Sequence, residues 1–434
     1  MKVAFYTLGC KLNQAETESL ASRFSQAGFQ LVPPGDGADI YIANTCTVTH
    51  IADRKSRHWL RLARRRNPQA LIIATGCYAQ RNRRELAELA DLIVNNEEKD
   101  HLLTLTQSFS PEWNGLSDSE TKQSQMTVTT ARTRSLIKIQ NGCRSHCTYC
   151  IVPKVRSYEY SLPASQIIED VKQKAVLGYK EVVLTGTKVG TYRDNSTDLR
   201  DLVQRILTST GIERLRLSSL QPSEISPEFL ALWHDERLCQ HFHLALQSGS
   251  ETVLQRMRRS YSLAQYQRTV DLIKDTIPDA AITTDIMVGF PGESDEEFEQ
   301  SYSFCQQAGF ASIHVFPYSP RPETAAAGMP EQVEDKIKQE RNQRMLELSR
   351  SSRRKFYKQF FGQTMPVLWE KETSPGTGIY SGLTGNYIRV LAHSGKHLNN
   401  EIVPVKLIGF RNQEMWGELT RRLEIINTDA QNES

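Results

Sequence analysis

Residues 1–106 alternate short apolar runs with stretches of helical periodicity. This alternation is typical of parallel strands joined by crossover helices. The apolar runs that we interpret as strands are residues 3–8, 40–43, 71–74 and 92–94. The pattern therefore predicts an N-terminal α/β domain with a parallel sheet at residues 1–106.

A second alternating region covers residues 131–330. Strand-like runs recur there at residues 136–140, 181–184, 214–217, 241–246, 280–288 and 312–316. Six βα units make up most of a TIM-type (βα) barrel, whose active site lies at the C-terminal ends of its strands. Two helix starts support this prediction: Ser226-Pro227 combines a capping acceptor with proline in the first turn, and Ser294 to Glu297 forms a capping box.

The pattern changes again after residue 330. Residues 331–362 form a basic helical segment that we expect to connect two domains, with a possible second role in facing RNA. Short alternating strands follow within residues 363–427, at residues 366–369, 378–381, 387–391, 402–408 and 415–419. Such a series is typical of a small, OB-like β-barrel that binds oligonucleotides. Residues 107–130 are polar and predicted to be a linker, and residues 428–434 a disordered tail.

Three cysteines, Cys143, Cys147 and Cys150, directly follow the first predicted barrel strand. Zinc sites and ferredoxin clusters normally have four protein ligands, so three thiols leave one coordination position open. Thiolates suit iron–sulfur clusters, and a 4Fe-4S cluster held by three of them keeps one iron free for a small chelating molecule. The alternatives are an incomplete zinc site or three core cysteines, although core cysteines do not cluster in a polar loop.

A second trio consists of Cys10, Cys46 and Cys77, each just beyond a predicted N-terminal strand. The carboxyl ends of parallel strands share one edge of a sheet, where ligands bind, so these thiols are expected to converge. Asn13 followed by Glu16 has the form of a helix start, which places Cys10 in the preceding loop. The alternative is three unrelated buried cysteines.

Composition limits the setting of the protein. Eight cysteines spread unevenly over 434 residues argue against a disulfide framework and indicate a reducing compartment. No apolar segment approaches the length that spans a bilayer, and the first residues lack a signal-peptide cleavage site, so we expect a cytoplasmic protein with no membrane partner. A net charge of +3 is too small to prove a nucleic-acid partner, which must be inferred from where the charge lies.

Arginines recur three or four residues apart in the helical segment between the second and third predicted strands. They are Arg54, Arg57, Arg61, Arg64 and Arg65. On one helical face they would form a row of guanidinium groups that no acidic residue interrupts. We interpret this row as an RNA-binding surface, because arginine fits phosphate groups; an ordinary solvated charged face is the alternative.

Small and polar residues follow the other predicted barrel strands. Those selected as candidates for cofactor binding are Thr185, Gly186, Ser219, Gln247 and Ser248. Small residues allow a ligand to approach the backbone and hydroxyl or amide groups can hydrogen-bond it, although glycine and serine are also ordinary turn residues. His241 and His243 share a strand face and could be ligands, but histidines satisfied by their neighbours are more common. Cys239 and Cys305 are expected in the core.

The two cysteine trios in this order resemble the methylthiotransferase family of radical S-adenosylmethionine (SAM) enzymes, and the resemblance spans nearly the whole chain. In that family an N-terminal domain holds an auxiliary 4Fe-4S cluster. The barrel holds a second cluster, which binds SAM and cleaves it to a 5′-deoxyadenosyl radical, and a C-terminal TRAM domain grips tRNA. Cys10, Cys46 and Cys77 match the auxiliary ligands, and Cys143, Cys147 and Cys150 match the ligands of the SAM cluster.

Softer motifs resemble the branch that adds a methylthio group to carbon 2 of threonylcarbamoyl-adenosine (t6A) at tRNA position 37. They are Thr7-Leu-Gly-Cys-Lys-Leu-Asn-Gln14, Asn44-Thr-Cys-Thr-Val-Thr49, Ala52-Asp-Arg-Lys-Ser-Arg57, Gly76-Cys-Tyr-Ala-Gln80 and Gly385-Asn-Tyr-Ile-Arg-Val390. The alternatives are the branches that act on isopentenyl-adenosine in tRNA or on a ribosomal-protein aspartate. An alternative from another class is a non-catalytic RNA-binding or metal-storage protein.

The resemblance implies two 4Fe-4S clusters, two equivalents of SAM and the anticodon stem-loop of tRNA as substrate. Carbon 2 of adenine is an unactivated aromatic position, so a radical is expected to activate it and no side chain is expected to act as catalytic acid or base. An electron donor such as flavodoxin or ferredoxin is also implied. We expect the protein to be a monomer.

The sequence departs from the family pattern at positions that leave every cysteine in place. The departures are Ser157 after Arg156 in place of glycine, Glu323 and Ala325 in place of glycine and proline, and Thr187-Lys188 in place of valine and a polar residue. We expect them to affect the substrate mouth and the loops around SAM.

Overall fold

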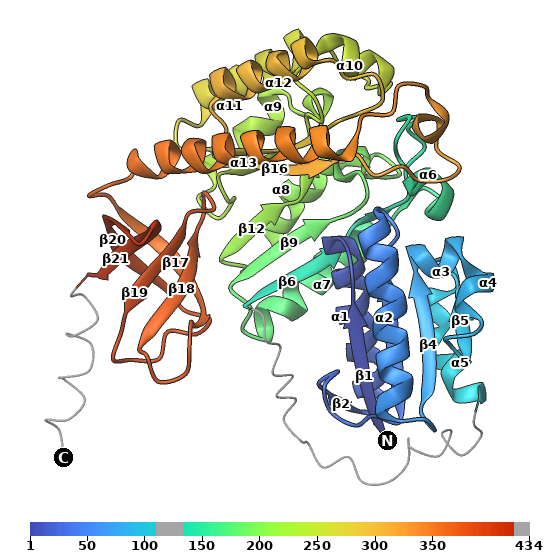
Figure 1. The fold of residues 1–434 in the computed structure, drawn as a ribbon. Helices are drawn as coiled ribbons and strands as arrows, with labels where there is room; N and C mark the ends of the chain where they lie inside the picture. The colour runs from blue at the N-terminus through green and yellow to red at the C-terminus, as the bar shows by residue number, and fades with distance from the viewer. Residues whose placement is uncertain (110–132, 421–434) are drawn as a thin grey trace, which may run out of the picture.

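The computed structural model describes residues 1–109 and 133–420 (Figure 1). In the N-terminal part, parallel strands form one sheet in the order β2-β1-β3-β4-β5. They are β1 (Lys2–Thr7), β2 (Gln30–Val32), β3 (Ile40–Thr45), β4 (Leu71–Gly76) and β5 (Leu92–Val94). The predicted parallel α/β sheet is confirmed. The pattern missed β2 because this edge strand has only 3 residues.

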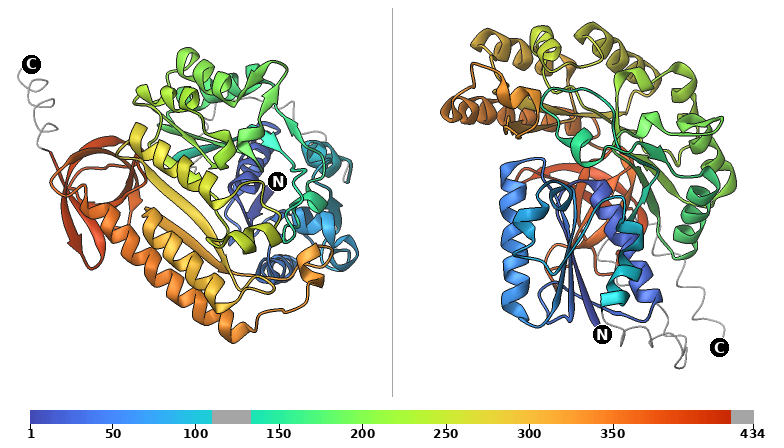
Figure 2. Two further views of the ribbon diagram at one scale, coloured as in Figure 1. Left: turned by 90° about the horizontal axis from the view of Figure 1, so that it is seen from above. Right: turned by 90° about the vertical axis from the view of Figure 1, so that its right-hand side faces the viewer.

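Helices cover both faces of this sheet (Figure 2). On one face lie α1 (Lys11–Gln26) and α5 (Leu102–Phe109), and on the other lie α2 (His50–Arg66), α3 (Cys77–Arg81) and α4 (Arg83–Leu86). Each face has its own apolar core, with Phe24 of α1 on one side and Trp59 of α2 on the other. Every residue of β3 and β4 is buried, as expected for parallel strands covered on both faces.

The middle of the chain forms an open, partial barrel. Two adjoining sheets, β12-β9-β6 and β13-β14-β15-β16, are linked by a bridge between Leu215 and Leu238. Their strands are β6 (Arg134–Lys138), β9 (Glu181–Thr185), β12 (Arg214–Leu217), β13 (Ser219–Leu220), β14 (His241–Leu244), β15 (Ala281–Val288) and β16 (Ser312–Pro317). The principal helices are α7 (Ala164–Val176), α8 (Leu199–Ser209), α11 (Leu263–Thr276) and α12 (Asp295–Ala308), and they lie outside the strands (Figure 2).

The predicted partial (βα)6 barrel is therefore confirmed, and so are its two helix starts. The Ser226 hydroxyl accepts a hydrogen bond of 3.2 Å from the Phe229 N–H at the start of α9 (Pro227–Leu230). The Ser294 hydroxyl accepts one of 3.2 Å from the Glu297 N–H at the start of α12. Local sequence specified both ends, because each cap needs only residues three positions apart.

The partial barrel of residues 134–317, called the half-barrel below, is followed by α13 (Asp335–Lys358). This helix leads into a closed barrel of order β17-β18-β19-β21-β20. Its strands are β17 (Thr364–Glu372), β18 (Ile379–Thr384), β19 (Arg389–His393), β20 (Ile402–Arg411) and β21 (Glu414–Leu419). This is the small β-barrel that the alternating pattern predicted. Not every basic residue of α13 faces solvent, because Arg341 is buried and lies 2.8 Å from the Glu293 carboxylate.

Two expectations about element ends were wrong. α1 begins at Lys11 with Cys10 as its N-cap, because the buried Asn13 side chain donates to the carbonyls of Leu8 and Thr45 instead of capping the helix. Residues 107–109 belong to α5, so the expected linker begins within a helix, and the rest of that segment and the tail lie outside the described residues. No helix within residues 1–109 and 133–420 has the length and apolarity to cross a bilayer.

A buried cluster of charges around Glu16 of α1 fixes the N-terminal sheet to the half-barrel. The Glu16 carboxylate lies 2.6 Å from the Lys99 ammonium group and accepts hydrogen bonds of 2.8 and 2.9 Å from Arg156. Lys138 of β6 lies 3.5 Å from the same carboxylate. Burial alone would raise the pKa of Glu16, but Lys99 and Arg156 lower it well below its usual range.

Replacing this carboxylate should destabilise the protein. We expect Glu16→Gln to lower the free energy of unfolding by about 3–5 kcal/mol, because the variant leaves buried cations without their partner. Glu88→Gln is a matched control at an exposed position and should change it by less than about 0.5 kcal/mol. Urea denaturation of the three proteins at pH 7 measures both effects.

The wild type and Glu16→Gln also test whether Glu16 is ionised in the folded protein. Because the pKa of Glu16 is lower in the folded than in the unfolded protein, its stabilising contribution is present above its ordinary pKa of 4.5 and is lost as the pH falls through the folded value. The stability difference between the wild type and Glu16→Gln should therefore shrink as the pH is lowered below 4.5. A difference independent of pH would contradict an ionised Glu16.

Candidate active site

Three thiols meet at the carboxyl edge of the N-terminal sheet. In this sheet β2 lies on one side of β1 and β3 lies on the other. The strand order therefore reverses between β1 and β3, which is the topological switch point. Ligands of open α/β sheets bind in the crevice at this point. Cys10 follows β1, Cys46 follows β3 directly and Cys77 follows β4 directly.

The glycines before two of these thiols are required by the backbone. Gly9 has φ +102°, and a Cβ at this position would lie 2.9 Å from the Cys46 sulfur. Gly76 has φ +95°, and a Cβ there would lie 2.4 Å from the Thr45 carbonyl oxygen. Any side chain at either position would push two of the cysteine-bearing loops apart.

The three thiols lie in a desolvated site. Burial, together with the neighbouring Cys77 and Cys10, raises the pKa of Cys46 to about 12. Cys10 lines a cavity and is therefore exposed. The protein around it still removes much of the water near its thiol, which raises the pKa of Cys10. Such thiols become thiolates only beside a compensating positive charge, which iron would supply.

The second trio lies in the loop after β6. The Cys147 sulfur accepts a hydrogen bond of 3.3 Å from Arg259, and the Cys143 sulfur accepts one of 3.4 Å from the Ser145 N–H. Burial, together with the neighbouring Cys147 and Cys143, raises the pKa of Cys150 to about 12. Within residues 1–109 and 133–420, no three His, Cys, Asp or Glu side chains are arranged to hold a single metal ion. Soft thiols bind the separate irons of one cluster, so each trio fits a 4Fe-4S cluster better than a single hard cation.

The two trios belong to neighbouring loops. Cys77 packs in a small apolar cluster with Ile151 and Val155, which lie just beyond Cys150. The Asn96 side chain adds a hydrogen bond of 2.8 Å to the Val155 carbonyl. The end of the N-terminal sheet therefore rests directly on the segment that follows the second trio.

Arg156 links the two loops. Its carbonyl oxygen accepts a hydrogen bond of 3.4 Å from the Cys143 N–H. Its guanidinium group donates to Glu16 and, at 2.9 Å, to the Asn13 side chain, one turn beyond Cys10. This position explains an arginine after the second trio, and it does not involve Ser157, where the family usually has glycine.

A second buried ion cluster joins the same parts of the chain at Asp53 of α2. Arg321, from the loop after β16, is buried and pairs with the Asp53 carboxylate. Arg81 lies 3.8 Å from Asp53 and 3.6 Å from Glu323. Glu323, one of the departures noted in the sequence, has φ +74°, in the left-handed region that favours glycine.

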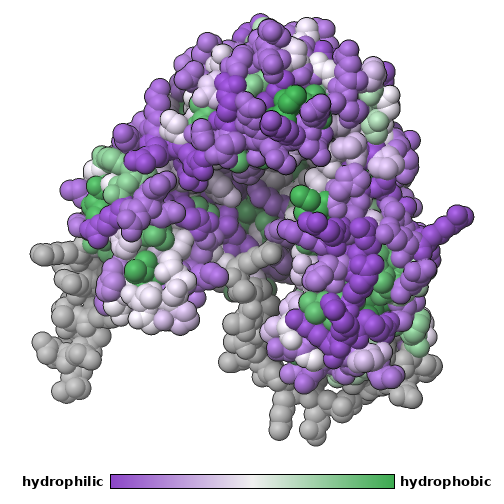
Figure 3. All heavy atoms as spheres, viewed as in Figure 1, coloured by the Kyte–Doolittle hydropathy of each residue, from purple (hydrophilic) through white to green (hydrophobic). Residues whose placement is uncertain are grey.

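A cavity of about 510 Å³ lies where the three parts of the chain meet. It is lined by Cys10 and Lys11 from the N-terminal sheet, by Arg353 of α13 and by Tyr387 of the C-terminal barrel, together with inner residues of the half-barrel. Figure 3 shows the molecule hollowed between the N-terminal sheet and the C-terminal barrel, with mainly hydrophilic residues around the hollow. One partly open space therefore connects Cys10 with Thr185 and Ser218 at the ends of β9 and β12, and with the first residues of β14, β15 and β16.

The predicted cofactor-binding residues divide into two groups. Thr185, Gly186 and Ser219 line this cavity, whereas Gln247 and Ser248 do not. The Ser248 hydroxyl is paired with that of Ser301 at 2.9 Å. Gln247 has φ +75° and a buried side-chain oxygen to which no group within residues 1–109 and 133–420 bonds.

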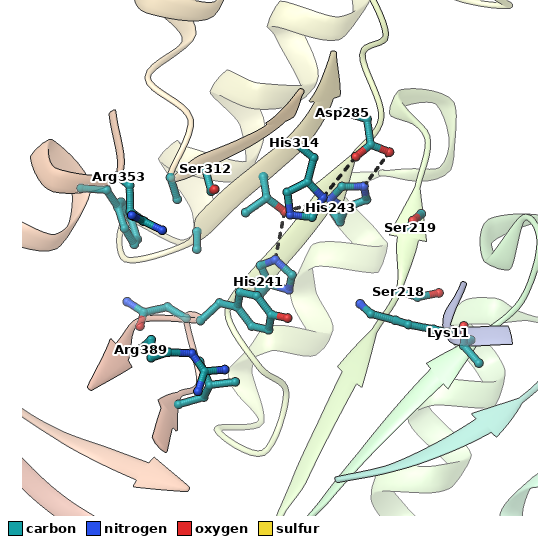
Figure 4. A pocket seen from close by; sticks show the side chains of 18 of the residues that line it. Lys11, Ser218, Ser219, His241, His243, Asp285, Ser312, His314, Arg353 and Arg389 are labelled. Carbon is teal, nitrogen blue, oxygen red and sulfur yellow. Dashed lines mark hydrogen bonds and ion pairs between the residues drawn. The ribbon is translucent and has the colours of Figure 1, made fainter. Parts of the chain in front are cut away.

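Histidines and an aspartate line the half-barrel side of the cavity (Figure 4). Asp285 of β15 lies 3.2 Å from the His243 ring and 3.4 Å from the His314 ring. Burial alone would raise the pKa of Asp285, but the two histidines lower it. The Thr283 hydroxyl lies 3.0 Å from both His241 and His243, so one ring nitrogen of each histidine has a neighbour as expected, but the buried Nδ1 of His241 has no partner within residues 1–109 and 133–420.

The sequence analysis did not identify Asp285 and His314. The signal was present, because polar residues two positions apart recur in β14, β15 and β16, and alternate residues of a strand point to the same face. Burial lowers the pKa of His241 well below its usual value, and Arg216 and Lys11 lower it further. His241 is therefore neutral at physiological pH.

Tyr387 closes the cavity from the C-terminal barrel. Its ring stacks on that of His241 with centroids 4.3 Å apart, and the Arg216 guanidinium lies 5.0 Å from its ring centroid. Burial alone would raise the pKa of Tyr387, but Lys11, Arg134 and Arg216 lower it. The cavity wall near Lys11 is therefore positively charged.

The arginine row of α2 is only partly free. Arg57 lies 3.0 Å from Glu85, and Arg64 lies 2.6 Å from Asp91. The expectation of an uninterrupted, unneutralised row was therefore wrong, because these acidic partners come from later elements. Arg54, Arg61 and Arg65 are exposed and have no carboxylate partner in the part of the chain that the structure describes.

Comparisons with known proteins agree with this architecture. The radical SAM superfamily matches residues 137–305, and an uncharacterised protein family, UPF0004, matches residues 2–95. A solved structure of the radical SAM methyltransferase TsrM from Kitasatospora setae has a TM-score of 0.54 at 13% identity, covering 75% of this chain and 77% of that one. This likeness shows that the fold is shared.

Curated relatives extend over nearly the whole chain. A threonylcarbamoyladenosine tRNA methylthiotransferase from Bacillus subtilis is 36% identical over 94% of this chain and 93% of its own. Its counterpart from Aquifex aeolicus is 38% identical over 90% and 96% of the two chains. A tRNA-2-methylthio-N(6)-dimethylallyladenosine synthase from Methylacidiphilum infernorum is 30% identical over 95% and 93%. With its two cysteine trios at the edges of two parallel sheets, this chain belongs to the methylthiotransferase family of radical SAM enzymes.

Proposed function

We propose that this protein is a tRNA methylthiotransferase that modifies carbon 2 of t6A at position 37, giving the 2-methylthio form. One observation carries the proposal: a single cavity is lined by Cys10, by strand ends of the half-barrel and by the C-terminal barrel. A nucleoside in this cavity would lie within reach of all three. The relatives with 36% and 38% identity, which bear the name of this activity, support the choice of substrate.

The residues fit two 4Fe-4S clusters. In this proposal Cys10, Cys46 and Cys77 hold one cluster, and Cys143, Cys147 and Cys150 hold the other. SAM binds at Thr185, Gly186 and Ser219, while Gln247 and Ser248 remain predicted contacts outside the cavity. When bound, the clusters and SAM supply the radical and the sulfur that an unactivated aromatic carbon requires.

The protein's own residues enclose and position the base. A cavity of about 510 Å³ can hold a nucleoside, and a bound nucleoside would displace water from it, which strengthens the electrostatic contacts inside. The stacked rings of Tyr387 and His241 form one wall and Lys11 lies at another. The base must leave its stack to enter, as single-stranded loop bases do readily.

The proposal also covers the partners. The C-terminal barrel and the free arginines of α2 bind the anticodon stem-loop, and a donor such as flavodoxin or ferredoxin supplies electrons. The protein works as a monomer in the cytoplasm. The paired Arg57 and Arg64 contribute less to RNA binding than the exposed Arg54, Arg61 and Arg65, because their charge is already used by carboxylates.

The substrate can be tested directly. Anaerobic protein supplied with SAM, a reductant and an anticodon stem-loop carrying t6A should give the 2-methylthio nucleoside in mass spectrometry. The same stem-loop carrying dimethylallyl-adenosine should give no such product. Product only from the second RNA would assign the protein to the other tRNA branch. A colourless preparation with zinc in place of iron would end the enzyme proposal.

Iron content tests the ligand sets. We expect about eight irons per chain in the wild type and about four in either Cys46→Ala or Cys147→Ala, because each substitution removes one ligand of one cluster. Cys305→Ala is a matched control, since Cys305 is buried in the half-barrel core, and it should retain all the iron. Loss of all iron in both single variants would show that the two sets are not separate.

The arginine row can be tested by its salt dependence. Replacing Arg61 and Arg65 by glutamine should weaken stem-loop binding and reduce the slope of log affinity against log salt by about one per lost phosphate contact. Arg64→Gln in the same helix is the control, because this side chain is paired with Asp91 at 2.6 Å. Fluorescence anisotropy with a labelled stem-loop measures both. An unchanged affinity and salt slope after replacement of Arg61 and Arg65 would remove α2 from the RNA interface.

A further inference from the structure

Lys11 is a cation without a partner at the centre of the proposed site. It is the first residue of α1, lies directly after Cys10 and lines the cavity. It is half-buried, and no group within residues 1–109 and 133–420 hydrogen-bonds or ion-pairs with its ammonium group. A half-buried ammonium ion without a counter-ion is unusual, because long cationic side chains normally reach bulk water or a carboxylate.

The acidic groups around the cavity are already used or lie elsewhere. Asp285 is held by His243 and His314. Glu181 is occupied by Arg216 at 2.7 Å. Glu414, the other acidic side chain in the cavity lining, is exposed. The described part of the chain therefore offers Lys11 no free carboxylate at this wall.

Buried polar atoms near Lys11 also await a partner. Ser218 and His241 line the same cavity, and only 5% and 4% of their respective surfaces are exposed. The Ser218 hydroxyl and the His241 Nδ1 bond to nothing within residues 1–109 and 133–420. Figure 4 shows the Lys11 side chain pointing into the cavity on the side of Ser218. Lys11 therefore offers one positive charge to a ligand, beside two buried polar atoms that have no partner within the described residues.

The start of α1 adds to the positive electrostatic potential near Lys11. The N–H groups of a first helical turn have no partner within their own helix, and the helix dipole is positive at this end. Cys10, the N-cap, makes no side-chain cap. An anion placed at Lys11 would therefore gain from the ammonium group and from the helix start at once.

We propose that Lys11 binds the carboxylate of the threonyl group of t6A and thereby selects this nucleoside over adenosines with uncharged substituents. The inference rests on the proposed function. The threonylcarbamoyl group ends in an amino-acid carboxylate and carries a hydroxyl group, which matches a cation next to two polar atoms. A dimethylallyl group is apolar and would leave Lys11 and both polar atoms unsatisfied in a closed cavity.

A rival role for Lys11 is to offset the negative charge of the neighbouring thiolates. The two roles differ in what they predict for substrate discrimination. A residue that serves only the cysteine site would affect iron binding and would treat all RNA substrates alike. A residue that binds the carboxylate would affect one RNA and spare the others.

Binding measurements on the anaerobic, iron-loaded protein separate these roles. Labelled anticodon stem-loops would carry t6A, the same nucleoside with its carboxylate converted to a carboxamide, or unmodified adenosine. The wild type should bind the t6A stem-loop on the order of tenfold to a hundredfold more tightly than the carboxamide form, the effect of one charged hydrogen bond. Lys11→Gln should abolish that ratio, and Lys11→Arg should restore a large part of it.

Arg353→Gln is the matched control, because Arg353 lines the same cavity and also has no partner within the described residues. It should weaken binding of all three stem-loops by a similar factor. The ratio is measured on one preparation, so it does not depend on how much of the protein is loaded with iron. Circular dichroism of Lys11→Gln and Lys11→Arg verifies that both fold.

Three results would overturn the inference. If Lys11→Gln keeps the wild-type ratio, with or without a loss of iron, Lys11 does not read the carboxylate, and the proposed function still stands. If Arg353→Gln removes the ratio and Lys11→Gln does not, Arg353 is the residue that reads it. If the wild type does not prefer t6A over the carboxamide form, no residue reads the carboxylate. Methylthiolation of the carboxamide stem-loop then shows whether the proposed function survives.

Discussion

Arg156 is the side chain on which the geometry of the site depends. Its backbone carbonyl accepts the N–H of Cys143, while its guanidinium group binds Glu16 and Asn13, one turn from Cys10. A buried guanidinium is tolerated only when a carboxylate meets it, so the N-terminal sheet and the half-barrel must dock in one register to satisfy Arg156 and Glu16 together. The two cysteine loops are thus held by one shared ion pair, although each forms on a separate sheet.

This docking creates the cavity and its electrostatic character. The space between the sheets is closed from the third side by Tyr387, which stacks on His241. Asp285 is paired with its two histidines and Arg389 with Glu370, whereas Lys11, Arg353 and Glu414 have no ion-pair partner within residues 1–109 and 133–420. The unpaired groups indicate what the cavity binds, because a wall whose polar and charged groups are all paired gives no indication of its ligand.

Much of the architecture followed from local pattern. Apolar runs predicted the principal strands of the N-terminal sheet, because a strand covered on both faces reads as a continuous apolar segment regardless of its neighbours. The half-barrel strands were predicted from apolar runs that polar residues interrupt in β14, β15 and β16. The cysteines were identified as two sets because strand ends of a parallel sheet share an edge. The caps at Ser226 and Ser294 were predicted correctly because each depends on neighbouring residues only, whereas Asn13 was assigned wrongly because its side chain donates to the carbonyl of Thr45, the last residue of β3.

The sequence by itself determined the strands, the two cysteine sets and the family, since each is written in neighbouring residues or in a fixed order of motifs. Only the tertiary structure decided which charges are free. Arg57 and Arg64 pair with Glu85 and Asp91, whereas Lys11 has no ion-pair partner within residues 1–109 and 133–420. The physical reason is that a charge pairs with whatever folding brings within a few ångströms, and that partner comes from another element of the chain.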